Sequence, residues 1–145
     1  MSDGTRNIER TFVMLKPDAL ERSLAGEILG RFERKGLKLV RLELRRVTKE
    51  LAAIHYAHLV AKPFYPELEA YITRGPVVAS VWEGIDAIRV VRNLVGATDS
   101  ILAAPGTIRG DFGVDKTENL VHASDSPESA AVEIRNFFNE SSSTL

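Results

Sequence analysis

The sequence predicts an α+β fold of the ferredoxin-like, split βαβ class, with a four-stranded antiparallel sheet. Strand-like and helical segments follow one another in the order β-α-β, helices, β-α-β. An added helical pair follows the second strand, and a long loop without a clear period precedes the last strand. The chain shows no linker, repeat or low-complexity tract, so we expect one domain over residues 1–145, with 1–8 and 139–145 frayed.

The first two strands and the helix between them are expected near the start of the chain. Residues 11–15 form an unbroken apolar run, which is typical of a strand buried on both faces. Asp18 and Glu21 fit a capping box for a helix that ends at a Gly36 C-cap. The apolar residues of the second strand, 37–47, change phase midway, which indicates either a bulge or cover on both faces.

The middle of the chain is expected to hold the helical pair, the third strand and a further helix. Helical segments at about 49–59 and 67–73 are separated by Lys62-Pro63-Phe64-Tyr65-Pro66. Residues 77–82 read as the third strand. Residues 86–95 have the spacing of an amphipathic helix, with apolar residues on one side and arginines on the other.

The long loop spans 96–118 and is rich in glycine and other turn formers. A loop of this length in a compact domain indicates either a functional segment or a missed element, and we interpret it as a binding loop. The last strand is expected to contain Leu120 and Val121, and the last helix to span about 126–138.

Composition excludes several classes of protein. The 145 residues are 44% hydrophobic, which suits one domain with a substantial core. Charge is balanced, with 19 basic and 20 acidic residues, so no nucleic-acid partner is expected. The absence of cysteine excludes disulfides and thiolate metal sites. No apolar run approaches the roughly 18 residues of a membrane span, and the first residues lack a signal peptide, so we expect a cytoplasmic protein without a membrane partner.

Three basic residues on separate elements are candidates for phosphate binding. Lys16 follows a buried strand, Arg92 lies on the polar side of a helix, and Arg109 is in the long loop. Guanidinium groups match phosphate oxygens, and an ammonium group adds a point charge. Each could instead be an ordinary surface charge. The chain has neither a P-loop nor a dinucleotide-type glycine motif, so a bound nucleotide must be held by side chains.

An aromatic residue and a histidine complete this set, each with a structural alternative. Phe64 lies between two prolines, where it could stack on a flat ligand or fill the turn. His122 ends the last strand, and Glu133 on the last helix could orient its ring. The alternatives are a structural histidine and a solvated carboxylate. We expect His55 and His58 to be structural.

The order of the motifs resembles the nucleoside diphosphate kinase family, from about Glu9 to Phe138. The motifs that carry the resemblance are Lys16-Pro17-Asp18, His55-Tyr56, Lys62-Pro63-Phe64-Tyr65, Gly75-Pro76-Val77-Val78-Ala79, Val81-Trp82-Glu83-Gly84, Gly96-Ala97-Thr98-Asp99, Pro105-Gly106-Thr107-Ile108-Arg109-Gly110-Asp111-Phe112 and Asn119-Leu120-Val121-His122-Ala123-Ser124-Asp125-Ser126. The segment around His122 is the most specific of them.

The resemblance implies an ATP-binding phosphotransferase that maintains nucleoside triphosphate pools. The γ-phosphoryl group of a nucleoside triphosphate would pass reversibly to a nucleoside diphosphate by a ping-pong route, with His122 as the phosphohistidine carrier. Mg²⁺ would arrive on the nucleotide phosphates without a direct protein ligand, with Asp125 as an outer contact. The family also implies a homotetramer or homohexamer. The other matching positions are Lys16, Arg92 and Arg109 on the phosphates, Thr98 as a hydroxyl donor, Phe64 under the base, Asn119 and Lys16 on the sugar, and Tyr56, Ser124 and Glu133 around the histidine.

The sequence departs from the family pattern at a few positions. Ala19, Ser23 and Ala123 replace glycines common in the family, and Ser100 replaces a common proline. A methyl group at position 123 could change the rate of transfer. Two other functions are compatible with the fold. One is a binding module of the same fold, either an RNA binder or a ligand-sensing regulatory domain. An RNA-recognition module would be expected to show aromatic-rich strand motifs, which the second strand lacks. An inactive relative would be expected to have lost a residue such as His122.

Overall fold

The computed structural model describes residues 7–138. The first strand, β1 (Ile8–Leu15), begins three residues earlier than expected. Residue 8 was expected to fray, and that expectation is wrong, because Ile8 pairs with Ile85 on the neighbouring strand. Residues 1–6 and 139–145, also expected to fray, lie outside the described range.

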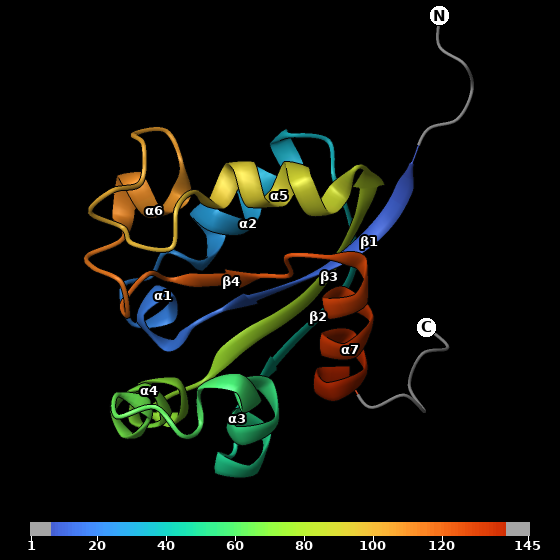
Figure 1. The fold of residues 1–145 in the computed structure, drawn as a ribbon. Coiled ribbons are helices and arrows are strands. Elements are labelled where there is room, and N and C mark those ends of the chain that lie inside the picture. Colours follow the sequence, from blue (N-terminus) through green and yellow to red (C-terminus); the bar gives the residue numbers. More distant parts are fainter. Residues whose placement is uncertain (1–6, 139–145) are drawn as a thin grey trace, which may run out of the picture.

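A four-stranded antiparallel sheet forms the centre of the molecule (Figure 1). Beside β1 it contains β2 (Lys38–Arg45), β3 (Val77–Ile85) and β4 (Val121–Ala123), in the order β2-β3-β1-β4. This order places the first and third strands in the middle and the second and last strands at the edges. The predicted α+β, split βαβ fold is confirmed.

Helices cover both faces of the sheet (Figure 1). The helices are α1 (Pro17–Glu21), α2 (Ala25–Arg34), α3 (Lys49–His55), α4 (Tyr65–Thr73), α5 (Ala87–Val95), α6 (Ile108–Phe112) and α7 (Pro127–Phe138), with a short 3-10 turn, η1 (Ala57–Leu59). The helices α2 and α5 pack on one face, and α3, α4 and α7 pack on the other. Among residues 7–138, no helix is long and apolar enough to cross a bilayer.

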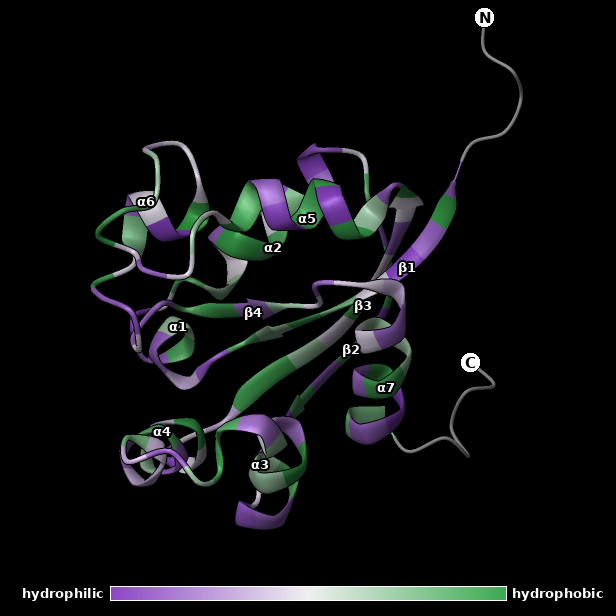
Figure 2. Cartoon of the chain, viewed as in Figure 1, coloured by the Kyte–Doolittle hydropathy of each residue, from purple (hydrophilic) through white to green (hydrophobic). Residues whose placement is uncertain are grey.

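Two hydrophobic cores result, because successive side chains of a strand point to opposite faces. Val13 and Leu15 enter the core beneath α2 and α5, whereas Phe12 and Met14 enter the core beneath α3 and α7. The predicted strand buried on both faces is therefore confirmed. Figure 2 shows hydrophobic colour along most of β3, the other central strand.

The structure confirms the predicted C-cap after α2 and the bulge in β2, but not the capping box at the start of α1. Gly36 has φ of +100° just after α2, as expected of a C-cap. The phase change in β2 is a bulge, since the register with β3 shifts between Leu39 and Arg41. The capping box is wrong, because the N-cap of α1 is Lys16, without a side-chain cap bond, and the Asp18 carboxylate binds elsewhere.

The long loop contains a helix that the sequence interpretation missed. The short α6 begins after Thr107, whose hydroxyl oxygen accepts a hydrogen bond from the Gly110 amide. The chain passes so closely here that a Cβ atom at Gly110 would lie 1.9 Å from the carbonyl oxygen of Ala104. The last strand begins at Val121, one residue later than expected, and Leu120 precedes it with a left-handed φ of +75°.

Candidate active site

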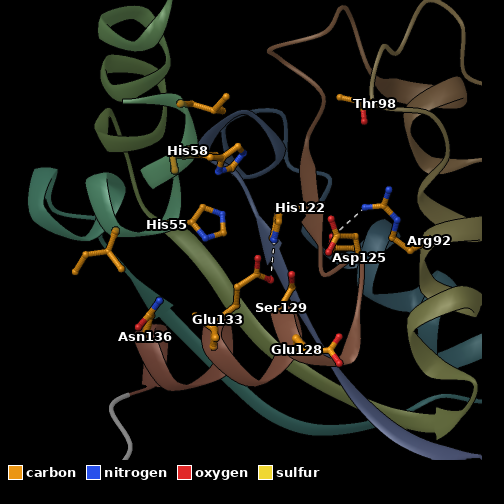
Figure 3. A pocket seen from close by; sticks show the side chains of 15 residues that line it. His55, His58, Arg92, Thr98, His122, Asp125, Glu128, Ser129, Glu133 and Asn136 are labelled. Atoms are coloured by element: carbon orange, nitrogen blue, oxygen red, sulfur yellow. Dashed lines mark hydrogen bonds and ion pairs between the residues drawn. The ribbon is translucent and has the colours of Figure 1, made fainter. Parts of the chain in front are cut away.

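His122 lies in the middle of β4, where it pairs with Met14 of β1. Its Nε2 atom is 2.9 Å from Oε1 of Glu133, which α7 brings across the sheet face (Figure 3). The Ser124 hydroxyl donates to the same carboxylate oxygen at 2.6 Å. When Nε2 carries the proton and donates it to Glu133, the neutral ring has its lone pair on Nδ1. The arrangement therefore selects Nδ1 as the nucleophilic atom.

A cavity of about 540 Å³ adjoins this histidine and gathers most of the predicted site residues. The predicted residues that line it are Lys16, Tyr56, Phe64, Arg92, Thr98, Arg109, Asn119 and His122. Ser124 and Glu133 do not line this cavity; they hold the ring of His122 through the contacts just described. A second cavity of about 550 Å³ shares the His122 side chain and contains Glu133, His55 and Asp125 (Figure 3).

Lys16 is the most deeply placed cation of the site. It follows β1 directly, is only 7% exposed, and donates through Nζ to Oδ1 of Asn119 at 2.9 Å. Burial and, to a smaller extent, the charge of Arg109 lower the pKa of Lys16 to about 7, and Asp18 opposes the shift. A phosphate group in the cavity would favour the charged form of this poorly solvated amine.

Arg109 is buried and donates to three backbone carbonyls. Its guanidinium group bonds the carbonyl oxygens of Val121 at 2.6 Å, Gly96 at 3.1 Å and Asn119 at 3.3 Å. It thus joins both ends of the long loop to β4. Burial, with a smaller contribution from Arg92, lowers the pKa of Arg109 to about 10, so it stays charged at neutral pH. Because Arg109 is buried, the alternative that it is an ordinary surface charge is excluded.

Arg92 and Phe64 are exposed at the rim of the cavity. Arg92, on α5, donates to the carbonyl oxygen of Ala123 at 3.2 Å (Figure 3). The Phe64 ring lies just before α4, lines the cavity and is 50% exposed. A ring that filled the turn would be covered, so its exposure favours the stacking interpretation.

Asn119 and Tyr56 both line the cavity. The Asn119 amide donates to the carbonyl oxygens of Thr98 at 2.9 Å and Lys116 at 3.0 Å, which fixes the loop against β4. The Tyr56 hydroxyl is buried and has no hydrogen-bond partner within residues 7–138. Burial raises the pKa of Tyr56, so the hydroxyl remains protonated and can donate to a ligand.

Two residues near the site have roles that the sequence interpretation did not assign. The buried Asp18 carboxylate accepts from the Tyr71 hydroxyl at 2.5 Å and from the Leu120 amide at 3.2 Å, two residues before His122. His55, expected to be structural, lies with its ring centroid 4.5 Å from that of His122. The sequence offered two signals for these roles: a carboxylate three residues after the end of a buried strand, and a histidine next to Tyr56.

The departures from the family pattern have different consequences for the backbone. Ala123 pairs with Val13 in the sheet and does not have a positive φ, so its methyl group does not strain the chain. Ser23 has φ of +59°, a conformation that costs a residue with a side chain roughly 1–2 kcal/mol. The backbone cost of losing glycine therefore falls at Ser23, between α1 and α2, and not beside the nucleophile.

Comparisons with known proteins agree with this geometry. The family model described as nucleoside diphosphate kinase matches residues 9–143. A nucleoside diphosphate kinase of Archaeoglobus fulgidus is 59% identical over 133 residues, which cover 92% of this chain and 88% of the relative. One of Symbiobacterium thermophilum is 56% identical, with 92% and 89% covered.

Solved structures give the same result. A nucleoside diphosphate kinase of Halobacterium salinarum in complex with CDP superimposes with a TM-score of 0.88 at 53% identity, covering 90% of this chain and 88% of that chain. An enzyme of Encephalitozoon cuniculi gives a TM-score of 0.90 at 41% identity, covering 94% and 93%. This chain therefore belongs to the nucleoside diphosphate kinase family.

Proposed function

We propose that this chain is a nucleoside diphosphate kinase that uses His122 as its phosphoryl carrier. The observation that carries the proposal is a histidine whose Nε2 is held by Glu133 at the wall of a cavity lined by Lys16, Arg92 and Arg109. A nucleophile with a fixed tautomer and cations placed for phosphate are what phosphoryl transfer requires.

In the first half of the ping-pong cycle, Nδ1 of His122 attacks the γ-phosphorus of a nucleoside triphosphate. The new P–N bond forms as the bond from the γ-phosphorus to the bridging oxygen breaks, and the nucleoside diphosphate leaves with that electron pair. The proton on Nε2 remains hydrogen-bonded to Glu133, which stabilises the positive ring. A second nucleoside diphosphate then takes the phosphoryl group by the reverse route.

The cations lower the barrier by neutralising charge on the transferring group. Lys16 and Arg109 are buried, so their interaction with phosphate oxygens is screened less than that of a surface charge. Tyr56 supplies a hydroxyl donor that has no hydrogen-bond partner among residues 7–138. Thr98 offers another hydroxyl at the cavity wall.

The nucleoside is expected to lie toward Phe64, with its sugar hydroxyls near Asn119 and Lys16. Stacking on an exposed ring recognises a flat base without reading its edge, so purines and pyrimidines should both be accepted. The two amide N–H donors of Asn119 already bond backbone carbonyls, and its Oδ1 atom accepts from Nζ of Lys16. A sugar hydroxyl can therefore donate to the remaining lone pair of Asn119 Oδ1 or accept from Nζ of Lys16.

Mg²⁺ is proposed as the cofactor, bound through the nucleotide. The cavity residues proposed to contact the phosphates, Lys16, Arg92, Thr98 and Arg109, are cationic or neutral and offer no carboxylate ligand, so Mg²⁺ would be held by the nucleotide. When bound there, Mg²⁺ would neutralise negative charge on the phosphates. Asp125, exposed on the adjoining cavity, is an outer contact in this proposal.

Self-association as a homotetramer or homohexamer is also proposed. The edge strand β2 exposes Leu42 and Leu44, at 48% and 69%, and the long loop exposes Ile101 and Leu102, at 74% and 76%. Such apolar surface is commonly covered by another subunit, and sedimentation velocity would measure the assembly size. A location in the cytoplasm remains a prediction from the sequence.

Initial-rate kinetics test the proposed function. With ATP and a second nucleoside diphosphate varied together, a ping-pong enzyme gives parallel double-reciprocal lines. Intersecting lines would require both nucleotides to be bound at once and would contradict transfer through the protein. A His122→Ala variant that folds normally is expected to show no transfer, and retention of transfer would exclude this histidine as the carrier.

A further inference from the structure

His55, His122 and Glu133 come together beside the phosphoryl carrier from three separate elements. Each offers one ligand atom, and these atoms all lie within 4.8 Å of one another. Figure 3 shows the ring of His55 next to His122 and Glu133, at the wall of the adjoining cavity. His55 has no part in the transfer described above, so its position beside the nucleophile needs another explanation.

His55 is available as a metal ligand. Its Nδ1 atom is buried and has no hydrogen-bond partner within the described chain. The ring is held by neighbours that leave this nitrogen unbonded: its centroid lies 4.6 Å from that of Tyr56 and 5.3 Å from that of Phe137. Burial lowers the pKa of His55 to about 2, with smaller contributions from nearby cations, so the ring is neutral at physiological pH. A neutral imidazole has a lone pair on one of its two nitrogens, and in the tautomer with the proton on Nε2 the unbonded Nδ1 atom can donate this lone pair to a metal.

We propose that His55, His122 and Glu133 form a binding site for Zn²⁺ that inhibits the enzyme. Two imidazoles and one carboxylate are a donor set that zinc accepts, with water in the fourth position. Magnesium prefers an all-oxygen octahedral shell and is a poor match for the same atoms. The adjoining cavity of about 550 Å³ gives the ion and its water access from solvent.

The three ligand atoms need to move only slightly to reach the separations of a tetrahedral zinc site. Zinc bonds of about 2.0–2.1 Å at tetrahedral angles separate ligand atoms by roughly 3.3 Å. The distance from His122 Nε2 to Glu133 Oε1 is 2.9 Å, so the ion enters between them with a slight opening. The longest separation in the group is at most 4.8 Å, so a rotation of the His55 ring that moves its nitrogen by up to about 1.5 Å closes the site.

Inhibition follows from the position of one proton. In the free enzyme the proton of the neutral His122 ring is on Nε2, shared with Glu133. A Zn–N bond uses the lone pair of Nε2, so this proton must move to Nδ1, by exchange with water. The lone pair that attacks phosphorus is then lost. This consequence rests on the proposed function of His122, whereas the zinc site itself does not.

Calorimetric titration of ZnCl₂ into the nucleotide-free, full-length protein tests the site. One Zn²⁺ per chain should bind. The His55→Phe variant keeps an aromatic ring against Phe137 but removes both ligand atoms, so its zinc affinity should fall by more than about 100-fold, beyond the effect of losing an outer partner. The matched control is His58→Phe, which changes an exposed histidine on the same cavity outside the group of three, and its affinity should match wild type.

Several outcomes would overturn the site: no binding to wild type, equal binding to His55→Phe, or equal loss in His58→Phe. Melting curves check that each variant folds. If His55→Phe does not fold, His55→Gln takes its place, since it removes the imidazole at nearly constant polarity. Replacement of zinc by Co²⁺ gives a second readout, because a tetrahedral cobalt centre absorbs strongly in the visible range. A weak, octahedral spectrum in wild type would also contradict the site.

A transfer assay tests the inhibition separately. Free Zn²⁺ is set by a metal buffer, so that chelation by nucleotide does not change it, and Mg²⁺ is held in excess. Wild type should lose at least tenfold in rate and recover when a zinc-selective chelator is added. His55→Phe should be at least tenfold less sensitive relative to its own zinc-free rate. Zinc that binds without slowing transfer would refute the proton argument. A wild-type protein that binds zinc but transfers no phosphate would instead refute the proposed function.

Discussion

Replacement of Asp18 by asparagine should damage both the stability and the activity of the protein. The Asp18 carboxylate is 2% exposed and accepts from the Tyr71 hydroxyl at 2.5 Å and from the Leu120 amide at 3.2 Å. An asparagine side chain keeps one acceptor oxygen and presents an amide donor to the second partner. One of the two donors is therefore left facing another donor in a buried site.

The expected loss of stability follows from these contacts. A hydrogen bond to a charged group contributes roughly 1.5–3 kcal/mol. Release of the left-handed Leu120 backbone returns roughly 1 kcal/mol. We therefore expect a net loss of about 1 kcal/mol, which lowers the melting temperature of a chain of this size by roughly 2–4 °C.

The activity should fall because Leu120 separates Asn119 from Val121 and His122. Without the tether the segment shifts, and a misplacement of about 1 Å can cost on the order of 100-fold in rate. Lys16 also loses the acid that raises its pKa, so a smaller fraction of it is charged at neutral pH. We expect kcat/KM to fall at least tenfold.

The assay pairs thermal melting at fixed protein concentration with initial-rate transfer. The matched control is Glu21→Gln, in the same helix, whose exposed carboxylate contacts Arg74. A surface pair of this kind contributes about 0–1 kcal/mol, so the control should melt close to wild type and transfer normally. If Asp18→Asn behaves like Glu21→Gln in both measurements, the tether does not position the site and the reasoning is refuted.

Three further predictions concern the cations and the histidine. Arg109→Ala leaves three backbone carbonyls without their donor, so it should cost about 3 kcal/mol of stability and more than tenfold in transfer; an unchanged melting temperature would contradict this. Glu133→Gln removes the charge that holds the Nε2 proton of His122, so ¹⁵N NMR should show a larger share of the other tautomer and transfer should slow by about 10–100-fold; an unchanged tautomer ratio would argue against that role. The pKa of Lys16 is about 7 in the free protein, so at pH 8 it is largely neutral, and phosphate binding should raise that pKa and take up a proton. Calorimetry of ADP binding in buffers of different ionisation enthalpy should detect this uptake at pH 8, less of it at pH 6, and none in Lys16→Met; equal uptake by wild type and the variant would contradict the assignment.

The fold could be predicted because its main signals are periodic and local. The apolar run in the second half of β1 and the spacing of Ile88, Val91 and Val95 in α5 both predict correctly which residues are buried. The order of these elements then leaves few topologies. The missed α6 has only five residues and lies among glycines, so it has no periodic signal.

The site was predicted less evenly, because its contacts join distant parts of the chain. Motif order indicated Lys16, Arg109 and His122, and the structure brings them to one cavity. Asp18 was interpreted by the local rule for helix starts, but its acceptor role depends on an amide 102 residues later, which no local rule can reveal. The position of His55 beside His122 depends on how α3 packs across the sheet. The residues next to His55 in the sequence do not determine this packing.

The central claim is that the phosphoryl group passes through Nδ1 of His122. Incubation of the protein with [γ-³²P]ATP and Mg²⁺, followed by removal of nucleotide, should leave about one label per chain in a bond that is labile to acid and stable to base. The label should leave on addition of a nucleoside diphosphate and should be absent from folded His122→Ala. Peptide mapping that places an acid-stable label elsewhere, or a label that persists in His122→Ala, would contradict the account.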